Sequence, residues 1–335
     1  MARQAPTDTP HVSVVVLVYN EVDSVEPLHR ELMGVLAALG TSFEVLYIDD
    51  GSRDGTTEKL GQTASRDARV RVVSFRRNFG QTAAVQAGID HSRGAVLVFL
   101  DGDMQNDPHD IPHLLQKIDE GYDVVSGWRR DRRDDASRVI PSKIANWVIA
   151  RVTGVQLSDF GCTLKAYRRE VIHDVKLSGE MHRFIPVFAA MIGARITELP
   201  VNHRPRTYGK SKHSFTRASR VMLDLVTVKL LGSHSTQPLY LFGFAAFAMW
   251  AVALVLAAIV ILQKVMPPYV YAHNNPLLLL SVVLAIVGVQ FILIGLSIRM
   301  YQESQSKPTY VVREILEKTP HRQPATNGRP AVRTR

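Results

Sequence analysis

Two carboxylates and an amide follow one apolar segment of the chain at close spacing. Asp101, Asp103 and Gln105 come after the run from Ala95 to Leu100, which is typical of a buried parallel strand. Open α/β sheets bind ligands at the carboxyl ends of their strands. Carboxylate and amide oxygens suit Mg²⁺ or Mn²⁺ bound to a diphosphate. These residues predict a divalent-cation site, with an acidic turn after the strand as the alternative, since Asp-Gly is a common turn pair.

Polar residues also follow the first two expected strands, at 12–18 and 43–48. Asp50 lies after the second strand and can accept a hydrogen bond from a base or a ribose. A turn or helix-capping role within Asp-Gly-Ser is the alternative for Asp50. The residues that end the first strand can line a nucleoside pocket, with a packed aromatic as the alternative for the tyrosine, and they are Val18, Tyr19, Asn20 and Glu21.

The elements that must position these residues alternate along the chain. An amphipathic helix is expected at 24–39, a short helix after the second strand and a further helix at 81–91. Further strands are expected at 70–75, 95–100 and 123–126. Alternation of this kind predicts a parallel sheet with helices on both faces and right-handed crossovers. The pattern is less regular beyond this point, with helices expected at 143–153 and 184–192 and a strand at 195–201. No G-x-G-x-x-G follows the first strand, which counts against a nicotinamide or flavin enzyme.

Two long segments, Leu239–Leu262 and Leu277–Ile298, carry no charged residue. Each is long enough to cross a bilayer as a helix, and neither has the polar face of a soluble core helix. Residues 299–335 carry eight Lys or Arg against three Glu, whereas the connecting segment 263–276 carries only Lys264. The positive-inside rule therefore predicts two transmembrane helices with both ends of the chain in the cytoplasm.

The formal net charge of +9 does not indicate nucleic-acid binding. More than half of the excess lies beyond the second apolar segment, where it can attract anionic lipid headgroups. The helical pattern at 214–232 fits either an interfacial helix or a helix packed on the soluble domain. We expect no secretory signal, zinc site or intrachain disulfide, because the first ten residues are polar, the twelve histidines lack zinc-ligand spacing and Cys162 is the only cysteine.

The motifs, taken in order, resemble family 2 glycosyltransferases over roughly residues 11–312. Val16–Glu21, Ile48–Asp54 and Asp101–Asp103 carry this resemblance. Further motifs resemble the polyprenyl-phosphate glycosyltransferases, and they are Arg77–Gly80, Asp103–Pro108, Asp159–Cys162 and Tyr208–Lys212. Within that group, the chain is most similar to undecaprenyl-phosphate 4-deoxy-4-formamido-L-arabinose transferases and bactoprenol glucosyl transferases, and less similar to dolichol-phosphate mannose synthases.

The resemblance implies a GT-A fold, with a Rossmann-like, mostly parallel sheet followed by two transmembrane helices. It implies inverting transfer of a sugar from a nucleotide sugar, in particular a UDP-sugar, to undecaprenyl or another polyprenyl phosphate. The product would be a lipid-linked monosaccharide for the bacterial cell envelope, made at the inner membrane, and a homotetramer is compatible with the relatives. The expected parts are a flexible 1–10, a cytoplasmic catalytic domain 11–212, juxtamembrane amphipathic helices 213–236, membrane helices 237–300 and a basic cytoplasmic tail 301–335.

The resemblance also assigns roles to single residues. Asp103 and Gln105 lie nearest the metal, and Asp101 contacts the nucleotide-sugar side. The nucleotide sugar would also contact Asn78, Gly80, Gly102, Arg206 and Lys212. The acceptor phosphate would contact Arg129, Arg138 and Ser142, and the group that carries the chemistry beside Asp101 would be Asp159, as general base.

Alternatives stand beside several of these roles. A phosphate monoester, whose second pKa is about 6, is largely ionised without a base, so Asp159 could instead position a substrate or cap a turn. The segment 129–135 could be a solvated loop with local ion pairs, and Arg206 and Lys212 could bind only lipid headgroups. Gly80 could be an ordinary helix-start glycine.

Two other functions compete with the polyprenyl-phosphate reaction. A processive polysaccharide synthase would carry a Gln-x-x-Arg-Trp segment, which this sequence lacks. Two membrane helices are also few for a channel that translocates a polymer. A membrane scaffold that has lost activity is the non-enzymatic alternative, and the intact Asp101, Asp103 and Gln105 disfavour it.

Overall fold

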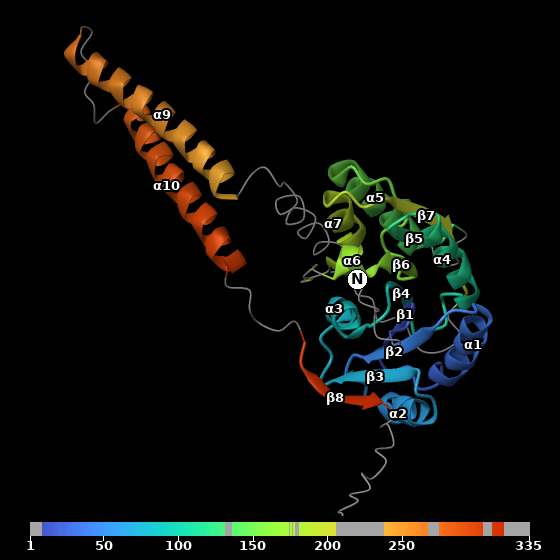
Figure 1. The fold of residues 1–335 in the computed structure, drawn as a ribbon. Helices are drawn as coiled ribbons and strands as arrows, with labels where there is room; N and C mark the ends of the chain where they lie inside the picture. Colours follow the sequence, from blue (N-terminus) through green and yellow to red (C-terminus); the bar gives the residue numbers. More distant parts are fainter. Residues whose placement is uncertain are drawn as a thin grey trace, which may run out of the picture. The chain divides into compact units, whose positions relative to one another are not determined.

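The computed structural model describes residues 9–130, 136–173, 175, 177, 181–205, 238–266, 275–303 and 310–317. The chain divides into two compact units, the first comprising Met1–Phe215 with Thr309–Arg335 and the second comprising Thr216–Pro308 (Figure 1). The amphipathic helices predicted at 213–236 lie outside the described residues, as do most of the predicted tail and the first eight residues.

In its described part, the first unit is built on an eight-stranded sheet with the order β7-β5-β6-β4-β1-β2-β3-β8. β6 and β8 run antiparallel to their neighbours, and the remaining strand pairs are parallel. The predicted α/β class with a mostly parallel sheet is confirmed. The strands are β1 (Val12–Val18), β2 (Phe43–Asp49), β3 (Val70–Phe75), β4 (Val96–Asp101), β5 (Val124–Trp128), β6 (Lys165–Arg168), β7 (Ile196–Pro200) and β8 (Val312–Glu317).

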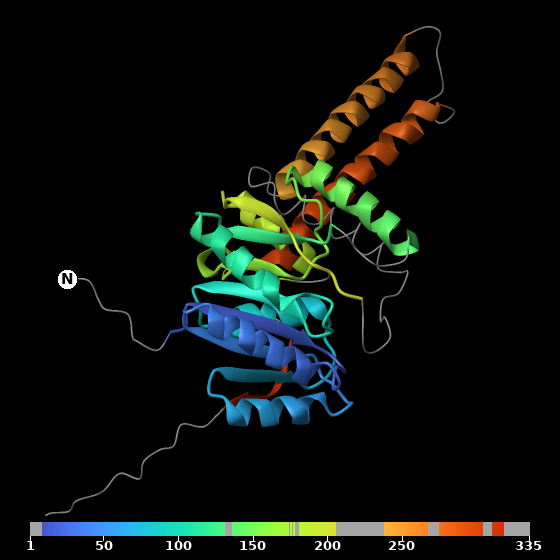
Figure 2. The ribbon, with the colours of Figure 1, turned by 90° about the vertical axis from the view of Figure 1, so that its right-hand side faces the viewer.

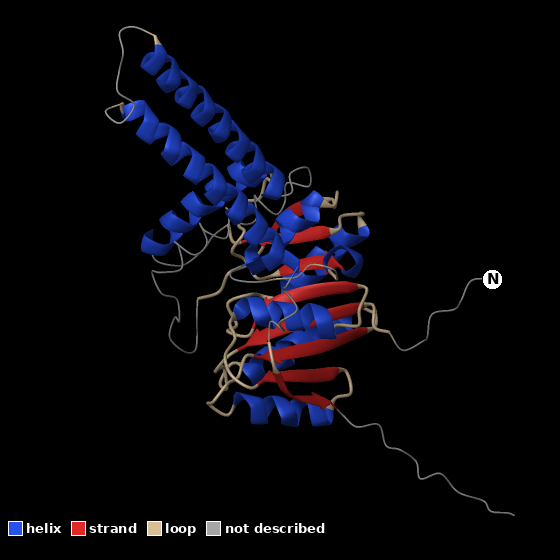
Figure 3. Cartoon of the chain, turned by 90° about the vertical axis from the view of Figure 1, so that its left-hand side faces the viewer, coloured by secondary structure: helices blue, strands red, loops and turns tan. Residues whose placement is uncertain are grey.

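Helices cover both faces of the sheet (Figures 2 and 3). One face packs against α1 (Val25–Ala38), α2 (Thr56–Arg66) and α4 (Ile111–Asp119). The opposite face packs against α3 (Gln81–His91), α6 (Arg169–Ile172) and α7 (Ile185–Met191). The other helices in the described part of this unit are the short η1 (Pro108–Asp110) and η2 (Met181–Phe184) and the longer α5 (Ala136–Thr153). The sequence pattern predicted that this helix would begin at residue 143. The observed α5 begins earlier, because the helix continues through Pro141.

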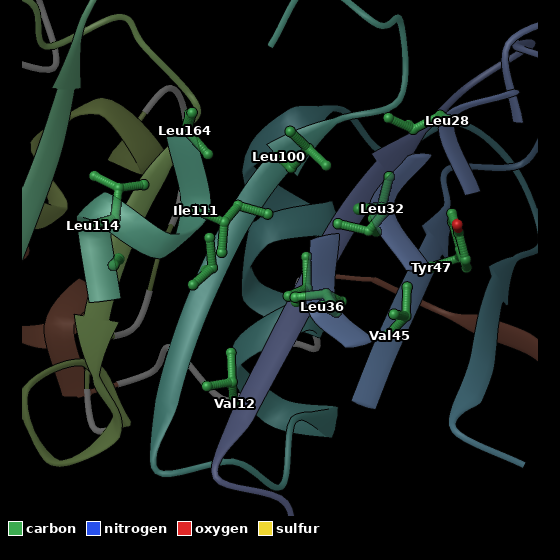
Figure 4. Close-up of a cluster of buried hydrophobic side chains, with 14 of the residues drawn as sticks. Val12, Leu28, Leu32, Leu36, Val45, Tyr47, Leu100, Ile111, Leu114 and Leu164 are labelled. Carbon is green, nitrogen blue, oxygen red and sulfur yellow. The ribbon is translucent and has the colours of Figure 1, made fainter. Parts of the chain in front are cut away.

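The central strand β1 shows why this sequence forms a two-faced core. All seven residues of β1 are buried, and Val12 and Val14 belong to the hydrophobic cluster under α1 whereas Val15 and Leu17 belong to the cluster under α3. Alternate strand residues point to opposite faces, so a continuous apolar run is what a strand covered on both sides requires. In α1, the residues facing the sheet recur every four positions, and Figure 4 shows them over the strands: Leu28, Leu32 and Leu36.

The last strand corrects one expectation from the sequence. Residues 301–335 are predicted to form a basic tail, but Val312–Glu317 pairs antiparallel with β3 at the edge of the sheet. The ring of Tyr310 stacks on Phe75 at a centroid distance of 5.0 Å, and Glu317 forms an ion pair of 3.2 Å with Arg71. Such a short, charged segment is typical of an edge strand, and only its long-range pairing distinguishes it from a tail.

The second unit contains two long apolar helices, α9 (Pro238–Val265) and α10 (Pro276–Glu303). Phe242–Val265 and Pro276–Ile298 are long and apolar enough to cross a membrane, in agreement with the two predicted segments. The two helices pack along each other, and the indole Nε1 of Trp250 donates a hydrogen bond of 3.0 Å to the carbonyl of Ala285. A Cβ at Gly288 would collide with the Trp250 ring, so this glycine permits the close approach.

Candidate active site

The loop that follows β4 carries the predicted metal ligands. Asp101 ends the strand, and the N–H of Gly102 donates a hydrogen bond of 2.8 Å to the carbonyl of Leu17 on β1. Met104 has a positive φ of 61°, and the N–H of Gln105 donates to the carboxylate of Asp103 at 3.1 Å. The chain therefore turns sharply after the strand, which places both aspartates and Gln105 in one short loop at the carboxyl edge of the sheet.

A second segment, residues 201–205, forms backbone hydrogen bonds with this loop. The N–H of Arg204 donates to the carbonyl of Gln105 at 2.9 Å, and Asn106 forms an isolated β-bridge with His203. The side-chain oxygen of Asn106 accepts the N–H of Asp101 at 3.2 Å. The segment 201–205 precedes Arg206 and Lys212, which lie outside the described residues. The loop conformation therefore depends on a region more than ninety residues later in the chain.

An ionic cluster beneath this loop was not predicted from the sequence. Glu31, Asp107 and His109 bring three metal-ligating atoms within 4.8 Å of one another. The guanidinium of Arg204 lies 2.6 Å from Glu31 and 2.7 Å from Asp107. The hydrogen bonds with Glu31 and Asp107 raise the pKa of Arg204 despite partial burial. Because this permanent cation already balances the two carboxylates, the cluster serves as an ion-pair network that joins α1 to the loop.

The loops after β1 and β2 are hydrogen-bonded to each other. The N–H of Asn20 donates to the hydroxyl of Ser52 at 2.9 Å, and the N–H of Arg53 donates to the side-chain oxygen of Asn20 at 2.8 Å. The N–H of Glu21 donates to Thr56 at 2.9 Å. The structure thus brings the ends of these two strands together, as predicted, with Val18 buried and Tyr19, Asn20 and Glu21 partly exposed.

Asp50 supports the loop that leads into α3. Its two carboxylate oxygens accept the N–H groups of Phe79, at 2.6 Å, and of Gly80, at 2.9 Å. Burial raises the pKa of Asp50 to about 6, although these two hydrogen bonds oppose the rise. Gly80 has a φ of +94° and is the N-cap residue of α3, so the alternative of a helix-start glycine is present in the structure. Asp50 therefore holds the loop before α3, whereas in the Asp-Gly-Ser segment the N–H of Ser52 donates to Asp49 at 3.0 Å. The contact of Asp50 with a base or ribose stays a prediction.

Asp159 and Arg129, predicted separately as base and phosphate ligand, form one buried pair. The Arg129 guanidinium donates to the two oxygens of Asp159 at 2.7 and 3.1 Å, and the N–H of Gly161 donates to the same carboxylate at 3.0 Å. Only 13% of the Arg129 side chain and 7% of the Asp159 side chain are exposed. Burial opposes the charge on Arg129, but the hydrogen bonds and charge of Asp159 outweigh burial and hold the pKa of Arg129 above its usual value. Arg129 is therefore not part of a solvated loop.

The other predicted ligands are placed only in part. Ser142 lies on α5, and position 138 lies in the first turns of the same helix, where the side chain of Arg138 is not among the described atoms. Asn78 and Gly80 lie in the loop that Asp50 holds. Sequence reasoning missed three polar residues, Gln81, Thr163 and Lys165, which line a cavity of about 20 Å³ together with Phe160 and Gly161.

Comparisons with known proteins identify the family of this chain. Residues 13–176 match the family described as glycosyl transferase family 2. The chain is 38% identical to a dodecaprenyl-phosphate galacturonate synthase of Rhizobium johnstonii, over 93% of this chain and 95% of that protein. It is also 38% identical to an undecaprenyl-phosphate 4-deoxy-4-formamido-L-arabinose transferase of Salmonella enteritidis, over 92% of this chain and 95% of the relative.

Solved structures show the same fold at low sequence identity. The glucosyl-3-phosphoglycerate synthase of Mycobacterium tuberculosis, solved with Mn²⁺, UDP and phosphoglyceric acid, has a TM-score of 0.53 at 18% identity, covering 66% of this chain and 78% of that one. The mannosyl-3-phosphoglycerate synthase of Rubrobacter xylanophilus has a TM-score of 0.54 at 17% identity, covering 68% and 76%. With a mostly parallel sheet, a matching family model and relatives of 38% identity over nearly their whole length, the chain belongs to glycosyl transferase family 2 and is a glycosyltransferase of the GT-A fold.

Proposed function

We propose that this protein transfers a single sugar from a nucleotide sugar, in particular a UDP-sugar, to undecaprenyl or another polyprenyl phosphate. The observation that carries the proposal is the meeting of two kinds of site at one sheet edge. The loop of Asp101 and Asp103 offers anionic oxygens, and the buried Arg129 offers a guanidinium beside Asp159. The names of the relatives of 38% identity support a polyprenyl-phosphate acceptor.

On the donor side, the chemistry of the loop after β4 fits a divalent cation. Asp101, Asp103 and Gln105 supply hard oxygen donors, as Mg²⁺ and Mn²⁺ require. A cation held there would neutralise the charge of the departing nucleoside diphosphate. The protein itself supplies the turn that presents these oxygens and, by our proposal, the residues from Val18 to Glu21 that line the nucleoside. Gly102 allows the loop after β4 to lie close to β1, since a Cβ at this position would lie 3.0 Å from the carbonyl oxygen of Leu17.

On the acceptor side, we assign Asp159 to positioning rather than to proton transfer. The acceptor phosphate, with a second pKa of about 6, is already an ionised nucleophile near neutral pH. Both oxygens of Asp159 accept hydrogen bonds from Arg129, which fixes the plane of the guanidinium. A planar guanidinium suits bidentate binding of phosphate oxygens. Arg138 and Ser142, on α5, complete the proposed phosphate site.

The two apolar helices fit an acceptor whose isoprenoid tail stays in lipid. We propose that both helices span the inner membrane, with the catalytic unit and both ends of the chain in the cytoplasm, because Lys and Arg are concentrated on that side of the two segments. Assembly into a homotetramer is part of the same proposal. The identity of the donor sugar depends on contacts in the binding pocket, and small substitutions of the residues that line the pocket can change these contacts.

Purified full-length protein, incubated with a panel of UDP- and GDP-sugars and a short polyprenyl phosphate, tests the function. We expect one UDP-sugar to give a polyprenyl-phosphate monosaccharide by mass spectrometry, and chelation by EDTA to abolish the product. Products longer than one sugar would instead support a processive synthase. Failure to bind any nucleotide sugar, measured by calorimetry, would support the inactive scaffold.

A further inference from the structure

We propose that Gln81 is a positioning residue that connects the donor site to the acceptor site through one side-chain amide. The inference rests on the proposed function, because it uses the roles assigned there to Asp101 and Asp159. Gln81 is the first residue of α3, and its Nε2 donates to a carboxylate oxygen of Asp101 and to the hydroxyl of Thr163, each at 3.2 Å. One amide group thus contacts the end of β4 and the segment that precedes β6.

The chemistry of the three partners determines the direction of these hydrogen bonds. An ionised carboxylate only accepts, so the NH₂ group of Gln81 must face Asp101. That group carries two hydrogens, one for Asp101 and one for the hydroxyl oxygen of Thr163. A glutamine is therefore suited to this position, because a glutamate would bring a second negative charge against Asp101 and a leucine would offer no donor.

The backbone of Gln81 is itself held from the donor side. Asp50, at the end of β2, accepts the N–H groups of Phe79 and Gly80, the two residues before Gln81. A Cβ at Gly51 would collide with the backbone of Arg77, so this loop packs directly on the turn after β2. The position from which the Gln81 side chain departs is therefore set by the loop that is proposed to contact the nucleotide.

The segment that Thr163 belongs to is held equally firmly on the acceptor side. The ammonium of Lys165, only 4% exposed, donates to the carbonyl oxygens of Phe160 and Cys162. At the start of this segment, Asp159 holds Arg129. Asp50 therefore holds the two residues before Gln81, and hydrogen bonds of Gln81 then connect this loop through Thr163 to the segment that presents Asp159.

The cavity that adjoins Gln81 is too small to hold a sugar. Its volume of about 20 Å³ is lined by Gln81, Thr163, Lys165 and His182 among others. This volume accommodates about one water molecule, far less than a sugar. Its hydrogen bonds to Asp101 and Thr163 make Gln81 a positioning residue: it orients the Asp101 carboxylate and keeps it in register with the Asp159 segment.

The test compares three variants of the full-length protein in detergent. Gln81→Leu removes both hydrogen bonds at similar volume, and Thr163→Val removes only the hydrogen bond to the acceptor-side segment. Gln86→Leu is the matched control, because Gln86 lies on the same helix and its amide bonds Asp90 and the N–H of Leu177 instead. Calorimetry gives the dissociation constant of UDP with Mn²⁺ and with EDTA, and steady-state kinetics gives kcat and KM for transfer.

We expect Gln81→Leu to weaken UDP binding about tenfold in Mn²⁺ and to leave it unchanged in EDTA, because a hydrogen bond to a charged group that orients the metal ligand is lost. Its kcat should fall about tenfold to hundredfold, by the same kind of loss. Thr163→Val should lower kcat without changing Mn²⁺-dependent UDP binding. The double variant should be no worse than Gln81→Leu, because both changes break one network.

Two results would overturn the inference. One is a Gln81→Leu variant whose UDP affinity in Mn²⁺ and kcat both stay within twofold of the wild type. The other is a Gln86→Leu variant with the same losses, which would reduce the effect to general destabilisation. The UDP measurement needs no acceptor, so a wild-type protein that binds UDP with Mn²⁺ but transfers nothing to polyprenyl phosphate would refute the proposed function and leave the inference testable by binding.

Discussion

Replacing Asp159 by asparagine separates a structural from a catalytic role at the acceptor site. In the wild type, both oxygens of Asp159 accept hydrogen bonds from Arg129, and the two side chains are 7% and 13% exposed. Asparagine keeps the shape and removes the charge. The guanidinium of Arg129 is then left in a buried site without its counter-charge.

The expected magnitude follows from this burial. Removing one partner of a buried ion pair destabilises a protein by about 3–5 kcal/mol. For a unit of this size, each kcal/mol lowers the melting temperature by about 2–4 °C, so Asp159→Asn should lower it by about 6–20 °C. The exposed pair of Lys117 and Glu120, at 2.7 Å, provides the control, and Glu120→Gln should change stability by about 1 kcal/mol or less.

Thermal unfolding followed by intrinsic fluorescence measures these shifts, and a double variant shows which role matters. Asp159→Leu combined with Arg129→Met removes both charges, so the melting temperature should recover toward that of the wild type. Transfer should stay low, because the proposed phosphate ligand is gone. An Asp159→Asn variant that melts within 2 °C of the wild type would refute the ion-pair reasoning, and a double variant with normal KM for polyprenyl phosphate would refute the acceptor assignment.

Three further predictions concern the donor site and the membrane topology. Asp103→Ala should reduce turnover by orders of magnitude with the melting temperature nearly unchanged, and full activity of this variant in EDTA would contradict the metal assignment. The pKa of Asp50 is raised by burial to about 6, so its contribution to stability is complete below its ordinary pKa of 3.8 and is lost as the pH rises through about 6. The melting temperature of the wild type relative to Asp50→Asn should therefore fall between pH 4 and 7, and a constant difference would show that Asp50 does not titrate in this range. Cysteines at Ala2 and Thr334 should be labelled from the cytoplasmic side and cysteines in 266–273 from the opposite side, with little background because Cys162 is buried; labelling of the two ends from different sides would contradict two spans.

The sequence predicted the residues that end the parallel strands better than the contacts that hold them. The apolar runs ending at Val18, Asp49 and Asp101 are long enough to define buried strands, and parallel strands must present their carboxyl ends at one edge. Asp50 and Asp101 could therefore be assigned to one edge without a structure. Their proximity follows from topology alone and needs no knowledge of side-chain packing.

The same reasoning could not predict strands that pair with distant parts of the chain. β6 has only four residues, and β8 pairs with a strand some 240 residues earlier, so neither shows a clear period of its own. The charged residues of β8 are typical of a solvated tail, and only the structure shows that Glu317 pairs with Arg71. Local pattern predicts a strand where burial is continuous, but an edge strand depends on what lies next to it.

Charge and spacing alone could not distinguish a metal site from an ion-pair network in this protein. Among the described residues, Glu31, Asp107 and His109 bring three possible ligand atoms within 4.8 Å of one another, yet Arg204 already forms ion pairs with both carboxylates. Asp101 and Asp103 lie one residue apart in a turn closed by the N–H of Gln105, and this turn is braced from outside by the backbone of Arg204. The same arginine thus neutralises one acidic pair and supports the loop that presents the other.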